Sequence, residues 1–330
     1  MCENLDRRLP RLRFLPFYQC TRAGVAPQCR TRRFRPVHLY SHIHTTLYPP
    51  DKTSYYEWIA APLAVLKESA EMNLKLGQIL HAKLLQGTPV VGSWLSLGSS
   101  SAAEIMAKAG YDFLVVDLEH SPTSVETAAE MIRVIDLAGC APLVRLPEFS
   151  PSIIKQVLDA GAHGIIVPNV DSADLAEAAV RATRYPPEGT RGVGLHRAQG
   201  YGNDFLEYFE SARTNLVVVA QIESNLAVQN IAKIVAVDGI DAVMIGPYDL
   251  SADLGAPGKF DSENFIQSVQ KVTQAARNAG VATGIHVVEP DPAAIESSLK
   301  AGHRFLVYSV DMRILDVGAR LGGDILKGRE

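Results

Sequence analysis

The sequence predicts a (β/α)8 barrel, a closed sheet of eight parallel strands with helices around it. From about residue 57 onward, eight short apolar runs alternate with amphipathic helical segments. The runs are continuously apolar, which is typical of strands buried on both faces in a parallel sheet. Eight such units in about 250 residues match the usual size of this barrel. The competing architecture is a doubly wound open sheet, but no G-x-G-x-x-G pattern opens the first unit.

The predicted elements follow one another in a regular order. A helical stretch over residues 66–85 precedes the first strand. The predicted strands cover residues 90–97, 113–120, 142–147, 164–170, 216–223, 242–250, 283–288 and 305–311. The helix-like segments between them include residues 101–110, 172–184 and 224–237. Glycine readily adopts the left-handed conformation that ends a helix, and the expected positions are Gly110, Gly139, Gly161, Gly280 and Gly302.

The first fifty residues differ from the rest of the chain in charge. They hold nine arginines, no lysine and two acids, so this segment carries a charge of +7. Because the net charge of the whole chain is −4, the remaining residues carry −11. We predict an Arg/Pro-rich extension over residues 1–56, either disordered or an organelle-targeting peptide, and the barrel over residues 57–330. Prolines interrupt the amphipathic helix that a targeting peptide uses, which argues against the second interpretation.

Charge, hydropathy and cysteine content restrict the partners and the compartment. The acidic body argues against nucleic acid, because binding phosphates needs a basic face. No stretch approaches the ~20 consecutive apolar residues of a membrane span. Cys140 is the one cysteine after residue 50, so no disulfide framework is expected. These features favour small-molecule substrates and a cytoplasmic protein, or a mitochondrial-matrix protein if residues 1–50 act as a transit peptide.

Polar residues end several of the predicted strands, where the reactive groups of such barrels gather. Glu223 and Asp249 are one β/α unit apart and should lie side by side. Two carboxylates with room for substrate and water oxygens suit Mg²⁺ or Mn²⁺. The alternative is that Glu223 caps the next helix and Asp249 makes a turn.

Two further residues could take part in chemistry. Arg145 lies within an apolar strand and needs an anion, either a structural acid such as Glu119 or a substrate oxyanion. His120 follows the second strand and could be a general acid/base or a structural side chain. The long glycine-containing segment 185–204 is expected to be non-helical and to form a wall of the site.

Four ordered motifs resemble those of the HpcH/HpaI aldolases. They are VDLEHSP at 116–122, TRYPPEGTRGVG at 183–194, QIES at 221–224 and IGPYDLSADLG at 245–255. The resemblance covers residues 75–325 and leaves the N-terminal arm outside. It implies class II, pyruvate-dependent aldol chemistry and a homo-oligomer, a hexamer in that family.

The resemblance also implies residue roles. Glu223 and Asp249 would bind a divalent ion (Mg²⁺, Mn²⁺ or Co²⁺) that pyruvate chelates. Arg145 would hold the keto oxygen, and His120 would be the acid/base, oriented by Asp159. The remaining implied substrate-binding positions are Trp94, Gln221 and the backbone at Gly246, Pro247 and Asp249.

The leading hypothesis is a metal-dependent aldolase that cleaves a 4-hydroxy-2-oxo acid to pyruvate and an aldehyde. None of the polar residues at the strand ends is lysine, which argues against a Schiff-base route. His286 and residues 195–204 would meet the aldehyde half of the substrate. The alternatives are an acyl-CoA lyase of the citrate lyase β-subunit or malyl-CoA lyase type, and a non-catalytic barrel.

Overall fold

The computed structural model describes residues 76–323 of the 330-residue chain. The predicted extension over residues 1–56, the proposed start of the barrel at residue 57 and the first half of the predicted helix 66–85 lie outside the described residues. The second half of that helix is present, as a helix over residues 76–85.

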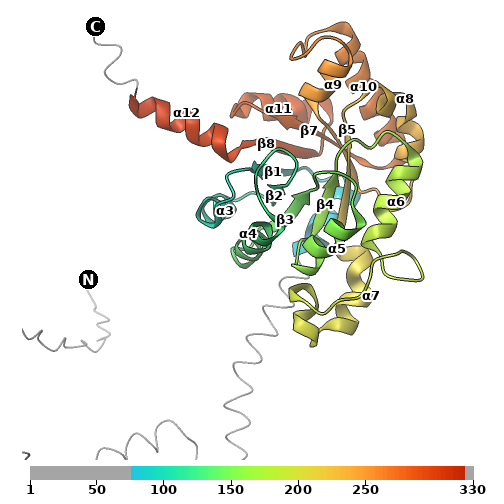
Figure 1. Cartoon of the computed structure of the whole chain (residues 1–330). Coiled ribbons are helices and arrows are strands. Elements are labelled where there is room, and N and C mark those ends of the chain that lie inside the picture. Colours follow the sequence, from blue (N-terminus) through green and yellow to red (C-terminus); the bar gives the residue numbers. More distant parts are fainter. Residues whose placement is uncertain (1–75, 324–330) are drawn as a thin grey trace, which may run out of the picture. The chain divides into compact units, whose positions relative to one another are not determined.

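The predicted (β/α)8 barrel is confirmed. Its eight strands form one closed sheet in sequence order, with β1 pairing β8 and every neighbouring pair parallel. Helices surround the sheet (Figure 1). The strands are β1 (Val90–Leu95), β2 (Phe113–Asp117), β3 (Ala141–Arg145), β4 (Gly164–Val167), β5 (Val217–Ile222), β6 (Ala242–Ile245), β7 (Ala282–Val287) and β8 (Phe305–Val310).

Local sequence signals mark the ends of most of the helices. Serine precedes five of them and accepts a backbone N–H of the first turn, which satisfies a donor that the helix itself leaves free. All five glycines expected at helix ends have positive φ, between 73° and 105°. The helices are α3 (Ser100–Ala107), α4 (Val125–Leu137), α5 (Pro151–Asp159), α6 (Ala173–Thr183), α7 (Phe205–Asn215), α8 (Asn225–Ile234), α9 (Pro247–Asp253), α10 (Glu263–Ala279), α11 (Pro292–Ala301) and α12 (Asp311–Gly323), with a 3-10 helix η1 (Arg197–Gly202) before α7.

The barrel interior is filled by alternate residues of the strands, because successive side chains of a strand point to opposite faces. The interior cluster includes Val115, Leu143, Val219 and Met244, while the second cluster lies between the sheet and the helices. Leu80 and Leu84, from the helix over residues 76–85, belong to the interior cluster. His81 of that helix contacts Asp241, which precedes β6, at 3.0 Å. This helix therefore closes the amino-terminal end of the barrel.

A stacked aromatic pair fills the same end of the interior. The rings of Phe113 and Phe305 lie parallel with their centroids 4.5 Å apart. Glycine makes this possible, because a Cβ at Gly92 would lie 2.3 Å from the Phe113 ring and one at Gly284 would lie 2.9 Å from the Phe305 ring. The two glycines provide the space for the two rings.

Replacing Phe305 with Ala should lower the free energy of unfolding by about 3–5 kcal/mol, because the cavity forms where neighbouring strands cannot collapse. Urea unfolding followed by circular dichroism measures this. The control is Leu206→Ala on α7, where the side chain is 73% exposed and its loss should cost little. A loss below about 1 kcal/mol for Phe305→Ala would show that the interior repacks.

Segment 185–204 lies elsewhere than predicted, and part of it is helical. Arg191 Nη2 donates to Asp159 Oδ1 at 2.6 Å, and Arg197 bonds the carboxylate of Asp136. Asp159 and Asp136 lie at the carboxyl ends of α5 and α4, and therefore at the amino-terminal ends of the strands that follow. Within this chain the segment is at the opposite end of the barrel from the strand-end residues, so it does not form a wall of their site or meet an aldehyde there.

The last helix leaves the barrel. α12 extends away from the sheet (Figure 1), and its Leu315 and Leu321 side chains are exposed. Between residues 76 and 323, no helix has the length and apolar composition needed to cross a membrane.

Candidate active site

The candidate site is the last inward-facing layer at the carboxyl ends of the strands. Asp117, Arg145 and Gln221 each follow an interior residue of the same strand by two positions, so strand alternation points them inward. The pairing of β2 with β3 places Asp117 directly opposite Arg145. Parallel strands thus bring side chains far apart in the sequence to one end of the barrel.

Arg145 is held by two acids and an aromatic ring. Its Nε and Nη2 atoms donate to the two carboxylate oxygens of Asp117, each at 2.8 Å, and its Nη1 lies 3.3 Å from Glu119 Oε2. The guanidinium lies over the Trp94 ring, 4.1 Å from the centroid. The sequence allows either Glu119 or a substrate as the partner of Arg145. The structure adds Asp117 as the main partner.

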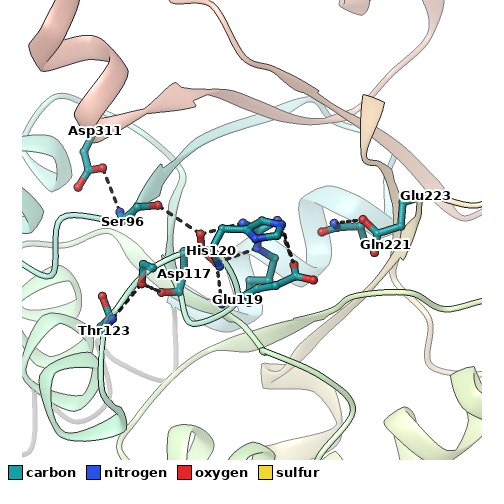
Figure 2. Close-up of polar contacts among 10 residues, drawn as sticks. Ser96, Asp117, Glu119, His120, Thr123, Gln221, Glu223 and Asp311 are labelled. Atoms are coloured by element: carbon teal, nitrogen blue, oxygen red, sulfur yellow. Dashed lines mark hydrogen bonds and ion pairs between the residues drawn. The ribbon is translucent and has the colours of Figure 1, made fainter. Parts of the chain in front are cut away.

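A second set of hydrogen bonds positions Asp117 (Figure 2). Ser96 Oγ donates to its Oδ2 at 3.2 Å, and the backbone N–H of Glu119 donates to its Oδ1 at 3.0 Å. Asp311 in turn accepts from the backbone of Ser96 at 3.0 Å. Burial alone would raise the pKa of Asp117, but the hydrogen bonds and charge of Arg145 outweigh it and lower the pKa. Asp117 is therefore a carboxylate fixed on three sides.

Glu223 is buried and fixed through both carboxylate oxygens. Oε1 accepts from the backbone of Asn169 at 2.6 Å, and Oε2 accepts from Gln221 Nε2 at 2.5 Å. Burial raises its pKa, and the charge of Asp249 raises it further. The N-cap of α8 is Ser224, so Glu223 is not the cap of that helix.

The acidic groups at this end exceed the available cations. Asp249 lies in the first turn of α9, and its charge adds to those of Glu223 and Asp117 on Glu119. Burial, partly offset by Arg145, raises the pKa of Glu119 to about 7. The charges that act on Glu119 are thus one guanidinium and three other carboxyl groups. This excess of negative charge suits a divalent cation.

Two carboxylates, Glu223 and Asp249, would supply the protein ligands. The described residues contain no group of three His, Cys, Asp or Glu side chains placed to hold a metal. Mg²⁺ and Mn²⁺ are often bound by one or two carboxylates, with water and substrate oxygens as the other ligands. The donor set fits such an ion with several positions open to a ligand.

The backbone at the start of α9 can contribute fewer donors than predicted. The N–H of Gly246 donates to Ile222 in the sheet at 3.2 Å, and Pro247 has no N–H. The N–H groups of Tyr248 and Asp249 lie in the first turn, where a helix provides no acceptor. A substrate at Gly246 and Pro247 would therefore meet the donors of the next two residues.

His120 lies at the rim without the predicted partner. Its side chain is 62% exposed, and its Nε2 is 4.0 Å from Glu119 Oε2. Asp159 accepts hydrogen bonds from Arg191 and from Gln199 Nε2, the latter at 3.2 Å, at the other end of the barrel. Within this chain the structure does not bring Asp159 to His120.

Comparison with known proteins shows to which family the chain belongs. The family model described as HpcH/HpaI aldolase/citrate lyase matches residues 91–315, most of the chain and all eight strands. The chain belongs to the HpcH/HpaI aldolase/citrate lyase family. The resemblance seen in the four sequence motifs is thereby confirmed.

Relatives of this HpcH/HpaI family member are named as aldolases. A hydroxypyruvate/pyruvate aldolase of Paraburkholderia phytofirmans is 39% identical over 71% of this chain and 91% of its own length. A 4-hydroxy-2-oxo-heptane-1,7-dioate aldolase of Shigella sonnei is 40% identical over 71% of this chain and 89% of its own. A solved family protein of Burkholderia cenocepacia is 36% identical, with a TM-score of 0.72, over 76% of this chain and 99% of its own.

Proposed function

We propose that the chain is a divalent-metal-dependent aldolase that cleaves a 4-hydroxy-2-oxo acid to pyruvate and an aldehyde. The observation that carries the proposal is the arrangement at one end of the barrel. The Glu223 and Asp249 carboxylates and the Arg145 guanidinium, which Asp117 holds in a fixed orientation, all lie close enough to Glu119 for their charges to act on it. None of the lysines among residues 76–323 lies on a strand, so a Schiff-base route has no candidate at the strand ends.

The mechanism depends on stabilising negative charge where it develops. A divalent ion bound by Glu223 and Asp249 would act as a Lewis acid toward the 2-oxo acid. Arg145 donates to the keto oxygen, whose charge grows as the C3–C4 bond breaks and the enolate forms. Asp117 holds Nε and Nη2, and Glu119 Oε2 lies 3.3 Å from Nη1, so a substrate would bind the guanidinium on its Nη1 side, next to Glu119. A donor fixed in advance needs no reorganisation during the reaction.

His120 takes the proton of the C4 hydroxyl as the C3–C4 bond breaks. His120 is exposed at the rim, where it can contact the part of the substrate that becomes the aldehyde. Arg145 contacts the part that becomes the pyruvate enolate. Glu119, between these two residues, is the nearest acid to the His120 ring.

Replacing His120 with Ala should lower the rate of C–C cleavage about 10²–10⁴-fold, because a general base is removed. Binding of the metal should persist, since His120 is not among the proposed ligands. Cleavage is followed by coupling released pyruvate to a dehydrogenase, and metal binding by calorimetry. The matched control is His196→Ala, which removes a histidine at the other end of the barrel. Equal rates for wild type and His120→Ala would assign proton transfer to another group.

The function itself is tested without knowledge of the aldehyde. The purified full chain is incubated with pyruvate in D₂O, and loss of the methyl proton signal is followed with Mg²⁺ and then with EDTA. Exchange that requires the metal supports enolate formation in this site. Absence of exchange with Mg²⁺, Mn²⁺ and Co²⁺ would contradict the proposal and favour an acyl-CoA lyase or a non-catalytic barrel.

The expected homo-oligomer is also a proposal, supported by the exposed leucines of α12.

A further inference from the structure

Asn169 has a backbone conformation that residues other than glycine rarely adopt. Its φ is 53°, and it lies in the loop that follows β4, at the end of the barrel that carries the proposed site. A Cβ makes the left-handed region unfavourable, although asparagine tolerates it better than most residues. Residues held in this region cluster at functional sites, where the surrounding structure imposes the conformation. The contacts of Asn169 therefore indicate what its conformation does.

The chain is fixed on both sides of Asn169. Val167 is the last residue of β4, and the N–H of Val170 donates to the carbonyl of Gln221 at 3.2 Å. Only Pro168 and Asn169 can turn the chain between these two points, and the ring of Pro168 restricts its own φ to about −65°. The direction of the peptide N–H between Pro168 and Asn169 therefore depends on the left-handed conformation of Asn169.

That N–H donates to a carboxylate oxygen of Glu223, whose side chain is confined on its other sides as well. The distance from the Asn169 nitrogen to Oε1 is 2.6 Å, and Gln221 Nε2 donates to Oε2 at 2.5 Å (Figure 2). A Cβ at Gly246 would lie 3.0 Å from Oε2, so this side has no room to spare. Each carboxylate oxygen has two lone pairs, and each can therefore accept one N–H and still bind an ion.

We propose that Asn169 is a positioning residue for Glu223, because its left-handed backbone aims the N–H that holds the carboxylate in the orientation that binds the divalent ion. The proposal rests on the proposed function, in which Glu223 is a metal ligand. The role belongs to the backbone, so the residue type matters through the conformation that it allows. Glycine adopts the left-handed region freely, whereas a β-branched residue is strongly disfavoured there.

The test measures the Kd of Mg²⁺ by calorimetry for the full chain and for two variants. Asn169→Val should raise the Kd about tenfold or more, because a hydrogen bond to a charged group is lost. Asn169→Gly keeps the backbone conformation and the N–H but removes the exposed side chain, so its Kd should stay close to that of wild type. Calorimetry gives the number of sites separately from the Kd, so an unfolded fraction does not imitate weaker binding.

The matched control is Tyr201→Val, which places the same β-branched residue at a φ of 55° within η1 and should leave the Kd of Mg²⁺ unchanged. An unchanged Kd in Asn169→Val would overturn the positioning role. Equal weakening in Asn169→Gly and Asn169→Val would also overturn it, because the effect would then come from the side chain. If wild type binds none of Mg²⁺, Mn²⁺ and Co²⁺, the proposed function fails and this role fails with it. Wild-type binding that Asn169→Val retains would overturn the positioning role alone.

Discussion

Replacing Glu223 with Gln is expected to reduce metal-dependent exchange and cleavage by about a thousandfold or more. The substitution keeps the shape of the side chain but removes one of two carboxylates, and Lewis-acid stabilisation is worth several kcal/mol. The amide also presents a donor where Oε1 and Oε2 now accept from Asn169 and Gln221. Calorimetric titration with Mg²⁺ and the exchange rate measure the two losses.

The same variant has an expected effect on stability. A bound ion raises the melting temperature of a protein that binds it in the folded state. Wild type should show this increase with Mg²⁺, and Glu223→Gln should not. The control is Glu263→Gln, which changes an acid in the first turn of α10 and should keep the increase. Full retention of the Mg²⁺ effect in Glu223→Gln would exclude this residue as a ligand.

Replacing Arg145 with Lys is expected to lower kcat/KM by about 10²–10³-fold although the charge is kept, comparable to the loss of one oxyanion donor. A lysine cannot bond both oxygens of Asp117 and present a third donor to a substrate in a fixed plane. It also loses the flat stacking on Trp94. Steady-state kinetics of cleavage and of pyruvate exchange give the loss for each step.

Arg133→Lys provides the matched control for Arg145→Lys. Arg133 pairs with Glu130 on the exposed face of α4, where the same exchange should change neither rate. Unaltered activity in Arg145→Lys would mean that a point charge suffices and that the fork geometry has no role. If binding weakens but kcat is unchanged, Arg145 contributes equally to substrate and transition state.

The fold could be predicted because each strand is buried on both faces. The eight apolar runs correspond one to one to β1–β8, and the ends differ by a few residues. The largest excess is in the run 242–250, which continues past β6 into α9 because Pro247 and Leu250 are also buried. Apolar content shows where the chain is buried, but it does not show where a strand changes into a helix.

Part of the site could be predicted for a similar reason. Polar residues that end apolar strands lie at the carboxyl end of a parallel barrel, so position in the sequence alone indicates Arg145, Gln221 and Glu223. Asp117 had the same signal, since it follows Phe113 and Val115 with the period of a strand. Its pairing with Arg145 depends on the register between β2 and β3, which places the two residues opposite each other.

Local periodicity and glycine positions are enough to predict the order of the strands, the glycine ends of five helices and the polar residues at the strand ends. Which of these groups meet depends on the tertiary fold. It pairs Arg145 with Asp117 across two strands, raises the pKa of Glu119 by burial among acids, and brings His286 to Trp94. It also places Asp159 and segment 185–204 at the far end of the barrel. Such contacts depend on strand register and on the direction of each helix, which no single segment encodes.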